Sequence, residues 1–213
     1  MCLEWNFSGV ATAAGVMPTS PSSRKRLWSI GLLVCSILLA GSLAGQEVQL
    51  RFDPAGTGAA ITLSGNFHDV EGSFAFKRGN VDFHPETGIA SGEIVFDATS
   101  GKTGDSGRDR KMHKDVIESQ TYPEIGFRPV RAEGMLASAG DSTLQVHGLF
   151  AIHGAEHEIT IPVRMTVQGN NWTAKATFTV PYAKWGMKNP SKLFLRVDNE
   201  VGVQFRAAGS LSR

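Results

Sequence analysis

The residues with the clearest capacity for chemistry are three histidines in the second half of the chain. His147 and His153 lie six residues apart, and His153 and His157 lie four apart. Residues an even number apart on a β-strand share a face, so His147 and His153 could point the same way. A zinc-type site needs three or four converging ligands, and the nearby Glu156 and Glu158 fall in the same turn-prone stretch. We therefore expect structural or solvated roles for the histidines, and a metal-dependent enzyme built on them stays open as an alternative.

Catalysis by an activated hydroxyl group is not indicated. A nucleophilic serine needs a neighbouring base that a third group orients, and no serine stands in a G-x-S-x-G or S-x-x-K context. Asp109 and His113 lie four apart in a helix-like stretch, which is typical of a surface pair. No two carboxylates stand out as a glycosidase couple. The sequence predicts no catalytic residue, no metal and no cofactor, and thus a protein that is not an enzyme.

Alternating apolar and polar residues recur along the chain at short spacing. This alternation places one face of a strand in a dry interior and the other in water. It predicts strands over residues 48–52, 61–64, 159–167, 174–180 and 201–207, with shorter pieces at 74–76, 81–83 and 94–96. Gly and Asn tolerate positive φ, so we expect turns at residues 77–80, 139–142 and 169–171. Many short strands joined by tight turns indicate an all-β antiparallel sandwich or barrel.

One segment, residues 106–120, has the pattern of a helix instead. Met112 and Val116 are four apart, and oppositely charged residues follow the same spacing. Asp105 or Ser106 can cap the start of this helix. A single short amphipathic helix in an all-β chain covers a barrel end or a sheet edge.

The first part of the chain has the pattern of a secretory signal peptide. Basic residues at 24–26 precede an uncharged stretch of 18 residues, 27–44, and small residues follow it. We expect cleavage after Ala44 or Gly45. An uncleaved membrane anchor is the alternative, because the stretch approaches the length of about 20 residues that a spanning helix needs. Met17 is a candidate start in place of the first Met.

Removal of residues 1–45 leaves residues 46–213 as one domain that is large enough for its own core. The removal takes away three basic residues and one acidic residue, so the formal net charge falls from +1 to −1. This near-neutral balance argues against a nucleic-acid partner. Both cysteines, Cys2 and Cys35, lie in the removed segment, so the domain has no disulfide. We expect a periplasmic or secreted protein.

Four segments, taken in order, resemble the YceI-like family. Residues 68–74 (HDVEGSF) are similar to an H-x-V-x-G-x-F segment, and residues 109–127 to a helix followed by Y-P-x-I-x-F. Residues 146–163 resemble a strand that ends in H-G and leads into an alternating strand. Residues 182–205 resemble the closing segment, with Trp185-Gly186 as an aromatic corner. The stretch after Phe96, which we expect to be a loop, is richer in Gly than the family pattern.

The resemblance implies an antiparallel lipocalin-like β-barrel of about eight strands with one short helix. It also implies export, and binding of an isoprenoid, fatty acid or related amphiphile inside the barrel for storage, transport or a stress response. A closed barrel of about eight strands has room inside for side chains or one slim ligand. Contact with a membrane is expected only through an uncleaved signal segment. The oligomeric state stays open, with a dimer as one possibility.

Aromatic and aliphatic residues are the better candidates for function. Of the 12 Phe residues, 11 lie in residues 46–213, where they spread over nearly every strand candidate. Ordinary core packing and the lining of a tunnel both require inward apolar side chains, so periodicity leaves both interpretations open. Burial of a long chain is worth about 0.8 kcal/mol per CH₂, so a tunnel needs few polar anchors. We expect the following residues to line the interior and bind a ligand: Phe67, Phe76, Phe83, Phe96, Phe127, Phe150, Ile161, Val163, Phe178, Trp185, Phe194 and Phe205.

A third function class also stays open. If the barrel is filled by side chains, the helix around residues 112–118 could dock a partner, and the chain would then be a structural or interaction module. An exposed apolar patch on that helix would favour this alternative, and a buried apolar face would count against it. Trp185-Gly186, after Tyr182, could plug one barrel end or gate it.

Overall fold

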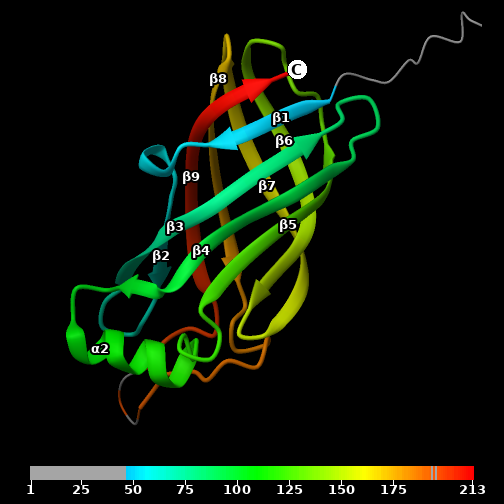
Figure 1. The fold of residues 1–213 in the computed structure, drawn as a ribbon. Helices are drawn as coiled ribbons and strands as arrows, with labels where there is room; N and C mark the ends of the chain where they lie inside the picture. The colour runs from blue at the N-terminus through cyan, green and yellow to red at the C-terminus, as the bar shows by residue number, and fades with distance from the viewer. Residues whose placement is uncertain (1–46, 193, 195) are drawn as a thin grey trace, which may run out of the picture. The chain divides into compact units, whose positions relative to one another are not determined.

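The computed structural model describes residues 47–192, 194 and 196–213, and the predicted signal segment lies outside this range. Within the described residues the chain forms an antiparallel β-barrel with α2 at one end and β1 at the other (Figure 1). The strands are β1 (Val48–Phe52), β2 (Gly58–Leu63), β3 (Val70–Phe83), β4 (Ala90–Lys102), β5 (Glu124–Glu133), β6 (Gly140–Ile152), β7 (Ala155–Gln168), β8 (Asn171–Val180) and β9 (Val201–Ser212). The helical turns are η1 (Pro54–Gly56), α2 (Ser106–Lys111) and the π-turn η2 (Met112–Val116).

Two short strands share one position in the barrel. β1 pairs with β3 through Val48 and Phe83 and with β9 through Leu50 and Leu211, whereas β2 pairs with the other halves of the same two strands. The turn η1 separates β1 from β2, and the carboxylate of Asp53 caps it by accepting from the amide of Ala55 at 3.0 Å. The nine strands therefore close an eight-stranded barrel. The prediction of an antiparallel barrel of about eight strands with one short helix is confirmed.

The alternation that predicted the strands becomes the inside and outside of this barrel. On β8 the side chains of Trp172, Ala174, Ala176 and Val180 are buried, while the residues between them are exposed polar ones or the half-buried Phe178. Successive side chains of a strand point to opposite faces, so the same four positions all point into the barrel. No helix in the described part of the chain has the length and hydropathy of a membrane span.

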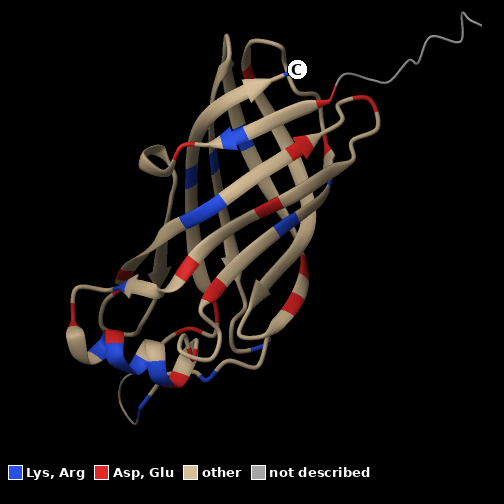
Figure 2. Cartoon of the chain, viewed as in Figure 1, with Lys and Arg blue, Asp and Glu red and all other residues tan. Residues whose placement is uncertain are grey.

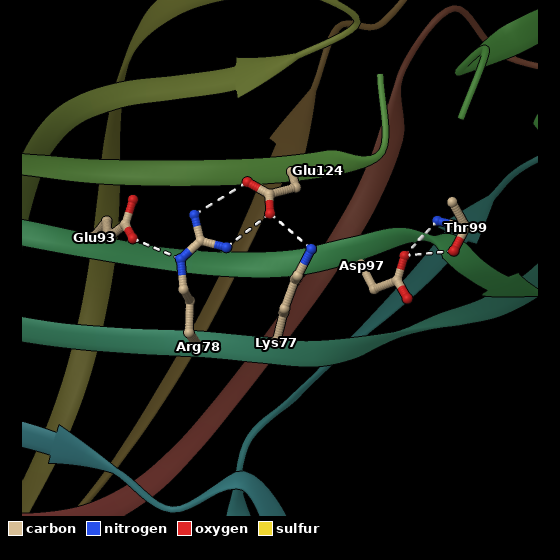
Figure 3. A network of polar contacts seen from close by, with 6 residues as sticks. All are labelled: Lys77, Arg78, Glu93, Asp97, Thr99 and Glu124. Carbon is tan, nitrogen blue, oxygen red and sulfur yellow. Dashed lines mark hydrogen bonds and ion pairs between the residues drawn. The ribbon is translucent and has the colours of Figure 1, made fainter. Parts of the chain in front are cut away.

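The turn expected at residues 77–80 is wrong, because β3 runs through this stretch without a break. The pairing with β4 shifts by one residue between Phe76 and Arg78, so the extra residue forms a β-bulge. Neighbouring strands hold the two basic side chains on the outer surface (Figure 3): Lys77 Nζ lies 2.8 Å from a Glu124 carboxylate oxygen, and Arg78 contacts both Glu124 and Glu93. Because Lys77 and Arg78 form ion pairs with neighbouring strands, a continuous β3 is favoured over a turn at these residues.

The loop expected after Phe96 is also wrong, because β4 continues to Lys102. The carboxylate of Asp97 accepts from the amide and the hydroxyl of Thr99 at 2.8 and 2.6 Å, and these hydrogen bonds lower the pKa of Asp97 (Figure 3). The hydroxyl oxygen of Ser100 accepts from the amide of Ala75 on β3 at 2.8 Å. Short polar side chains thus satisfy the backbone of a wide bulge, and the strand continues beyond it.

The hairpin between β6 and β7 turns on two residues. His153 and Gly154 have φ of 53° and 75°, the left-handed conformation that a tight hairpin turn requires at both central positions. A Cβ atom at Gly154 would collide with the ring of Tyr122, which follows η2. The hairpin tip is therefore packed against the chain that leads from the helical segment into β5. The expected turn at residues 169–171 is confirmed between β7 and β8.

The ion pairs of Figure 3 predict an acid-sensitive contribution to stability. Hydrogen bonds from Arg78 and Lys77 lower the pKa of Glu124 to about 2, below its ordinary value of 4.5. A carboxyl group with a lowered folded-state pKa stabilises the fold above its unfolded-state pKa, and this contribution is lost as the pH falls through the folded-state value. Because the Glu124 side chain is 37% exposed, solvent screening limits the contribution to about 1 kcal/mol.

We therefore expect Glu124→Gln to lower the free energy of unfolding at about pH 7 and to have a progressively smaller effect as the pH falls from 4.5 to about 2. Urea denaturation across this pH range measures the difference between variant and wild type. Glu86→Gln, in the turn between β3 and β4, is the matched control and should follow the wild-type pH profile. Parallel pH profiles of wild type and Glu124→Gln would contradict the prediction.

Candidate functional site

The barrel encloses a cavity of about 400 Å³. This volume falls within the range of small-molecule sites, about 300–1,000 Å³. Most of its lining is aliphatic and aromatic, and strands from every side of the barrel contribute to it. The polar lining residues come from the α2 end, where His68, Thr103, Arg108 and Lys111 reach the cavity. The arrangement is an apolar chamber with polar groups at one end.

Of the twelve residues that the sequence nominated, the structure brings seven together around this cavity. They share inward positions on β4 to β9, where the strand alternation directs them to the interior. They are Phe96, Phe127, Phe150, Ile161, Val163, Phe178 and Phe205. Their contact with a ligand stays a prediction.

Three other nominated residues do not line the cavity. The ring of Phe76 lies 5.9 Å from that of Phe96, between centroids, and does not line the cavity. Phe83 is buried in a separate small cluster with Ala90 and Ala132. Trp185 stacks flat on His157, with ring centroids 4.1 Å apart. These positions follow from bulges and connections that alternation alone does not reveal.

Phe67 and Phe194 do not line the interior, contrary to expectation. Their exposed fractions are 69% and 84%. They lie on the connections from β2 to β3 and from β8 to β9, outside the strands whose pleat directs side chains inward. The side chain of Asn66 joins these two connections. Its Nδ2 donates to the carbonyl oxygen of Phe194 at 2.9 Å, and its Oδ1 accepts from the backbone amide of Arg196 at 3.1 Å.

Aromatic contacts close the cavity towards the β1 end. Phe52 lies 4.9 Å from Trp172 and 5.9 Å from Phe76, and Phe96 bridges Phe76 and Phe205 with centroid distances of 5.9 and 6.2 Å. Beyond this aromatic floor, the β1 end is filled by a second cluster of buried residues that includes Val48, Met165, Val167 and Leu211. The interior is therefore partly a filled core and partly a cavity.

Small residues on β8 leave the space that the aromatic rings do not fill. Ala174 and Ala176 line the cavity between Trp172 and Phe178. They were not among the twelve residues expected from the sequence, although the alternation of β8 places them on the inner face. Arg108 and Lys111 were also missed, because the orientation of α2 on the barrel is not readable from the helix pattern.

The segment formed by α2 and η2 covers the other end of the cavity. Met112, Val116 and Ile117 contact the cavity and pack on the core cluster of this end. This inward apolar face counts against the use of the helix as a partner-docking surface. The helix ends before the expected residue 120, because Glu118 has a φ of 48° and the chain turns there.

His113 ties this helical cover to the barrel. Its Nε2 lies 2.8 Å from the carbonyl oxygen of Gly101 on β4, so this nitrogen carries the proton and donates. Its Nδ1 lies 2.9 Å from the hydroxyl of Ser119, a side chain in a residue with 0% exposure. Asp109 accepts from the amide and hydroxyl of Thr103 instead. The expected Asp109–His113 pair is thus replaced by two separate attachments.

The three histidines that suggested metal chemistry have different surroundings. His147 Nδ1 lies 2.7 Å from the Thr160 hydroxyl, whereas His153 occupies the hairpin turn and His157 stacks on Trp185. Among the residues that the structure describes, no group of three or more His, Cys, Asp or Glu side chains converges as a metal site would require. Each histidine therefore contacts the barrel wall or the hairpin separately, and the three do not form one site.

Comparisons with known proteins agree with this architecture. The sequence model of the YceI-like domain matches residues 43–208. The solved structure of BcnA from Burkholderia cenocepacia is similar with a TM-score of 0.59 and 19% identity, over 74% of this chain and 99% of that one. A polyisoprenoid binding domain from Saccharophagus degradans, implicated in plant cell wall breakdown, is similar with a TM-score of 0.58 and 16% identity, over 78% and 98% of the two chains. No curated protein sequence matched the chain.

The contacts of His113 predict the stability of the helical cover. We expect His113→Ala to increase amide hydrogen exchange in residues 106–120, because it removes both attachments and leaves the buried Ser119 hydroxyl without this partner. The expected loss of unfolding free energy is about 1–3 kcal/mol. Lys114→Ala, at an exposed position of the same turn, is the control and should exchange like wild type. Unchanged exchange in His113→Ala would contradict this attachment.

Proposed function

The chain belongs to the YceI-like domain family, and we propose that it binds one long apolar ligand inside its barrel. The observation that carries this proposal is the apolar cavity of about 400 Å³ between the aromatic floor and the helical cover. An isoprenoid, a fatty acid or another slim amphiphile suits this shape. The related domain from Saccharophagus degradans is described as polyisoprenoid binding, which supports the same ligand class here.

Apolar contact is sufficient to hold such a ligand. Each buried CH₂ contributes about 0.8 kcal/mol, and association costs at least about 4 kcal/mol in lost translation and rotation. A chain that buries ten or so methylene groups gains about 8 kcal/mol, which exceeds the lower bound of that cost without a polar anchor along its length. The wall fits this demand, since Phe127, Phe150 and Phe178 present rings and Ala176 leaves room.

The proposed role is binding for storage, transport or a stress response, without a catalysed reaction. A hydrolytic or transfer reaction would need a nucleophile or acid–base pair that faces the ligand. The described cavity lining presents mostly hydrocarbon, and at its α2 end Arg108 and Lys111 donate hydrogen bonds to the backbone of Thr103 and Pro190. This arrangement supports a carrier or reservoir.

A cavity-filling substitution tests the proposal. Ala176→Phe places a ring where the ligand chain would lie, so we expect at least about a tenfold loss of affinity for long-chain probes. Thr179→Phe adds the same ring at an exposed position of the same strand and should bind like wild type. Native mass spectrometry of the purified protein, with competition against a fluorescent long-chain probe, measures both. A wild-type protein that carries no apolar molecule and binds no probe would overturn the proposal.

We also propose that the protein is exported to the periplasm or outside the cell. Support comes from the basic cluster at residues 24–26 and the uncharged stretch at 27–44. The mass of the protein recovered from an osmotic-shock fraction should correspond to a chain that begins after Ala44 or Gly45. Recovery of the uncut chain from the cytosol alone would contradict export, and recovery of the uncut chain from membranes would indicate an anchor.

A further inference from the structure

Two cationic side chains line one end of an otherwise apolar cavity. Arg108 and Lys111 both come from α2, and both reach the cavity lining. Charged groups are costly next to hydrocarbon unless an opposite charge or hydrogen bonds compensate them. Arg108 is exposed and Lys111 is half-buried, so water and nearby hydrogen-bond acceptors together compensate these two charges at the end of the cavity.

Neutral oxygen atoms hold both side chains. Lys111 Nζ donates to the carbonyl oxygen of Pro190 at 2.6 Å. The guanidinium of Arg108 donates to the hydroxyl and the carbonyl oxygen of Thr103, each at 3.1 Å. Neither side chain takes part in any of the ion pairs formed within the described ranges. The nearby carboxylate of Asp109 is engaged with the amide and hydroxyl of Thr103.

The charges that act on Lys111 are mostly positive, although Asp and Glu residues also lie along this end of the barrel (Figure 2). Burial lowers the pKa of Lys111, and the charges of Lys192 and Lys188 lower it further, while Asp115 opposes them. Lys and Arg residues lie along α2 and on the chain beside it at the same end of the barrel (Figure 2). An anion at this position would be attracted by several cations at once.

We propose that the ligand is an amphiphile with an anionic head group, a carboxylate or a phosphate, which binds at Arg108 and Lys111 while its chain fills the cavity. The proposal rests on the proposed function and specifies the ligand class for the same cavity. The ammonium group of Lys111 has three donors, so it can keep its bond to Pro190 and still donate to the head group. The guanidinium of Arg108 offers five donors, of which the bonds to Thr103 use two.

A purely structural role for Lys111 makes a different prediction. The bond to Pro190 connects α2 to the segment between β8 and β9, so Lys111 could act as a latch alone. Loss of a latch would change the affinity of every long-chain ligand by the same factor. Loss of a head-group contact would weaken anionic ligands and leave neutral ligands of the same length unchanged.

The test compares palmitate, hexadecyl phosphate and hexadecanol, which share one chain length and differ in head group. Competition with a fluorescent neutral probe measures their affinities for the wild type, Lys111→Met, Arg108→Gln and the control Lys175→Gln, a cation on the outer wall. We expect the wild type and the control to prefer at least one anion over the alcohol by about tenfold. Each of the two α2 variants should reduce this preference severalfold and bind hexadecanol unchanged.

Salt provides a second measurement if a variant folds poorly. The wild-type affinity for the preferred anion should fall as ionic strength rises, whereas that for hexadecanol should not. Lys111→Arg keeps the charge and should keep the preference. The palmitate and hexadecyl phosphate arms distinguish a carboxylate from a phosphate head group.

Equal affinity of the wild type for the alcohol and both anions would overturn the head-group proposal and leave the apolar ligand in place. An equal loss for all three ligands in Lys111→Met would also overturn it, in favour of a latch. Failure of all three ligands to bind the wild type would instead contradict the proposed function itself.

Discussion

The pleat of the β-strand is the constraint on which this molecule depends. Every second side chain of a strand points to the same face, and closure of the sheet turns one of those faces into an interior. On β8 the consequence is plain, since buried Trp172, Ala174 and Ala176 alternate with exposed polar residues. Closure also gives each long strand a hydrogen-bonded neighbour on both sides, although β8 pairs with only the Val163–Gln168 part of β7. Local alternation and global closure together produce a dry interior.

The size of the inward side chains then decides which part of that interior is solid. At the β1 end, the ring of Phe52 meets that of Trp172 edge to face, and the ring of Phe205 meets that of Phe96 in the same way. A packed cluster of buried residues fills the space behind these rings. Towards α2, the inward positions of β8 include two alanines, and the opposing rings do not reach across. The helical cover completes this half, because His113 connects it to Gly101 of β4. One barrel thus combines a filled half at the β1 end with a hollow half at the α2 end.

The sequence predicted what is encoded by regular spacing and missed what is decided by neighbours. The alternation located most of the strands and seven of the cavity-lining residues, because the period of two is a local property. It could not distinguish a turn from a bulge. Residues 77–80 carry Gly and Asn, the stretch after Phe96 carries Gly, Ser and Thr, and only the adjacent strands show that the chain continues in both places.

Side chains outside regular strands were the least predictable. Phe67 and Phe194 carry the same apolar signal as Phe127, yet they lie on connections that have no inner face. Arg108 and Lys111 look like ordinary surface cations of a short helix in the sequence. Their contact with the cavity depends on how α2 lies over the barrel end, which is set by Met112, Ile117 and the attachment of His113.

The pairing of β1 with β9 has a consequence for the order of events during folding. Leu50 pairs with Leu211, so the first and last described strands complete the barrel together. Contacts between residues so distant in sequence form late, because the intervening chain must first be ordered or its closure entropy overcome. Until the C-terminal strand is available, β3 lacks a bridge to β9 and the apolar interior is open to solvent. The barrel therefore cannot close progressively along the chain, and its apolar interior stays exposed until β9 is in place.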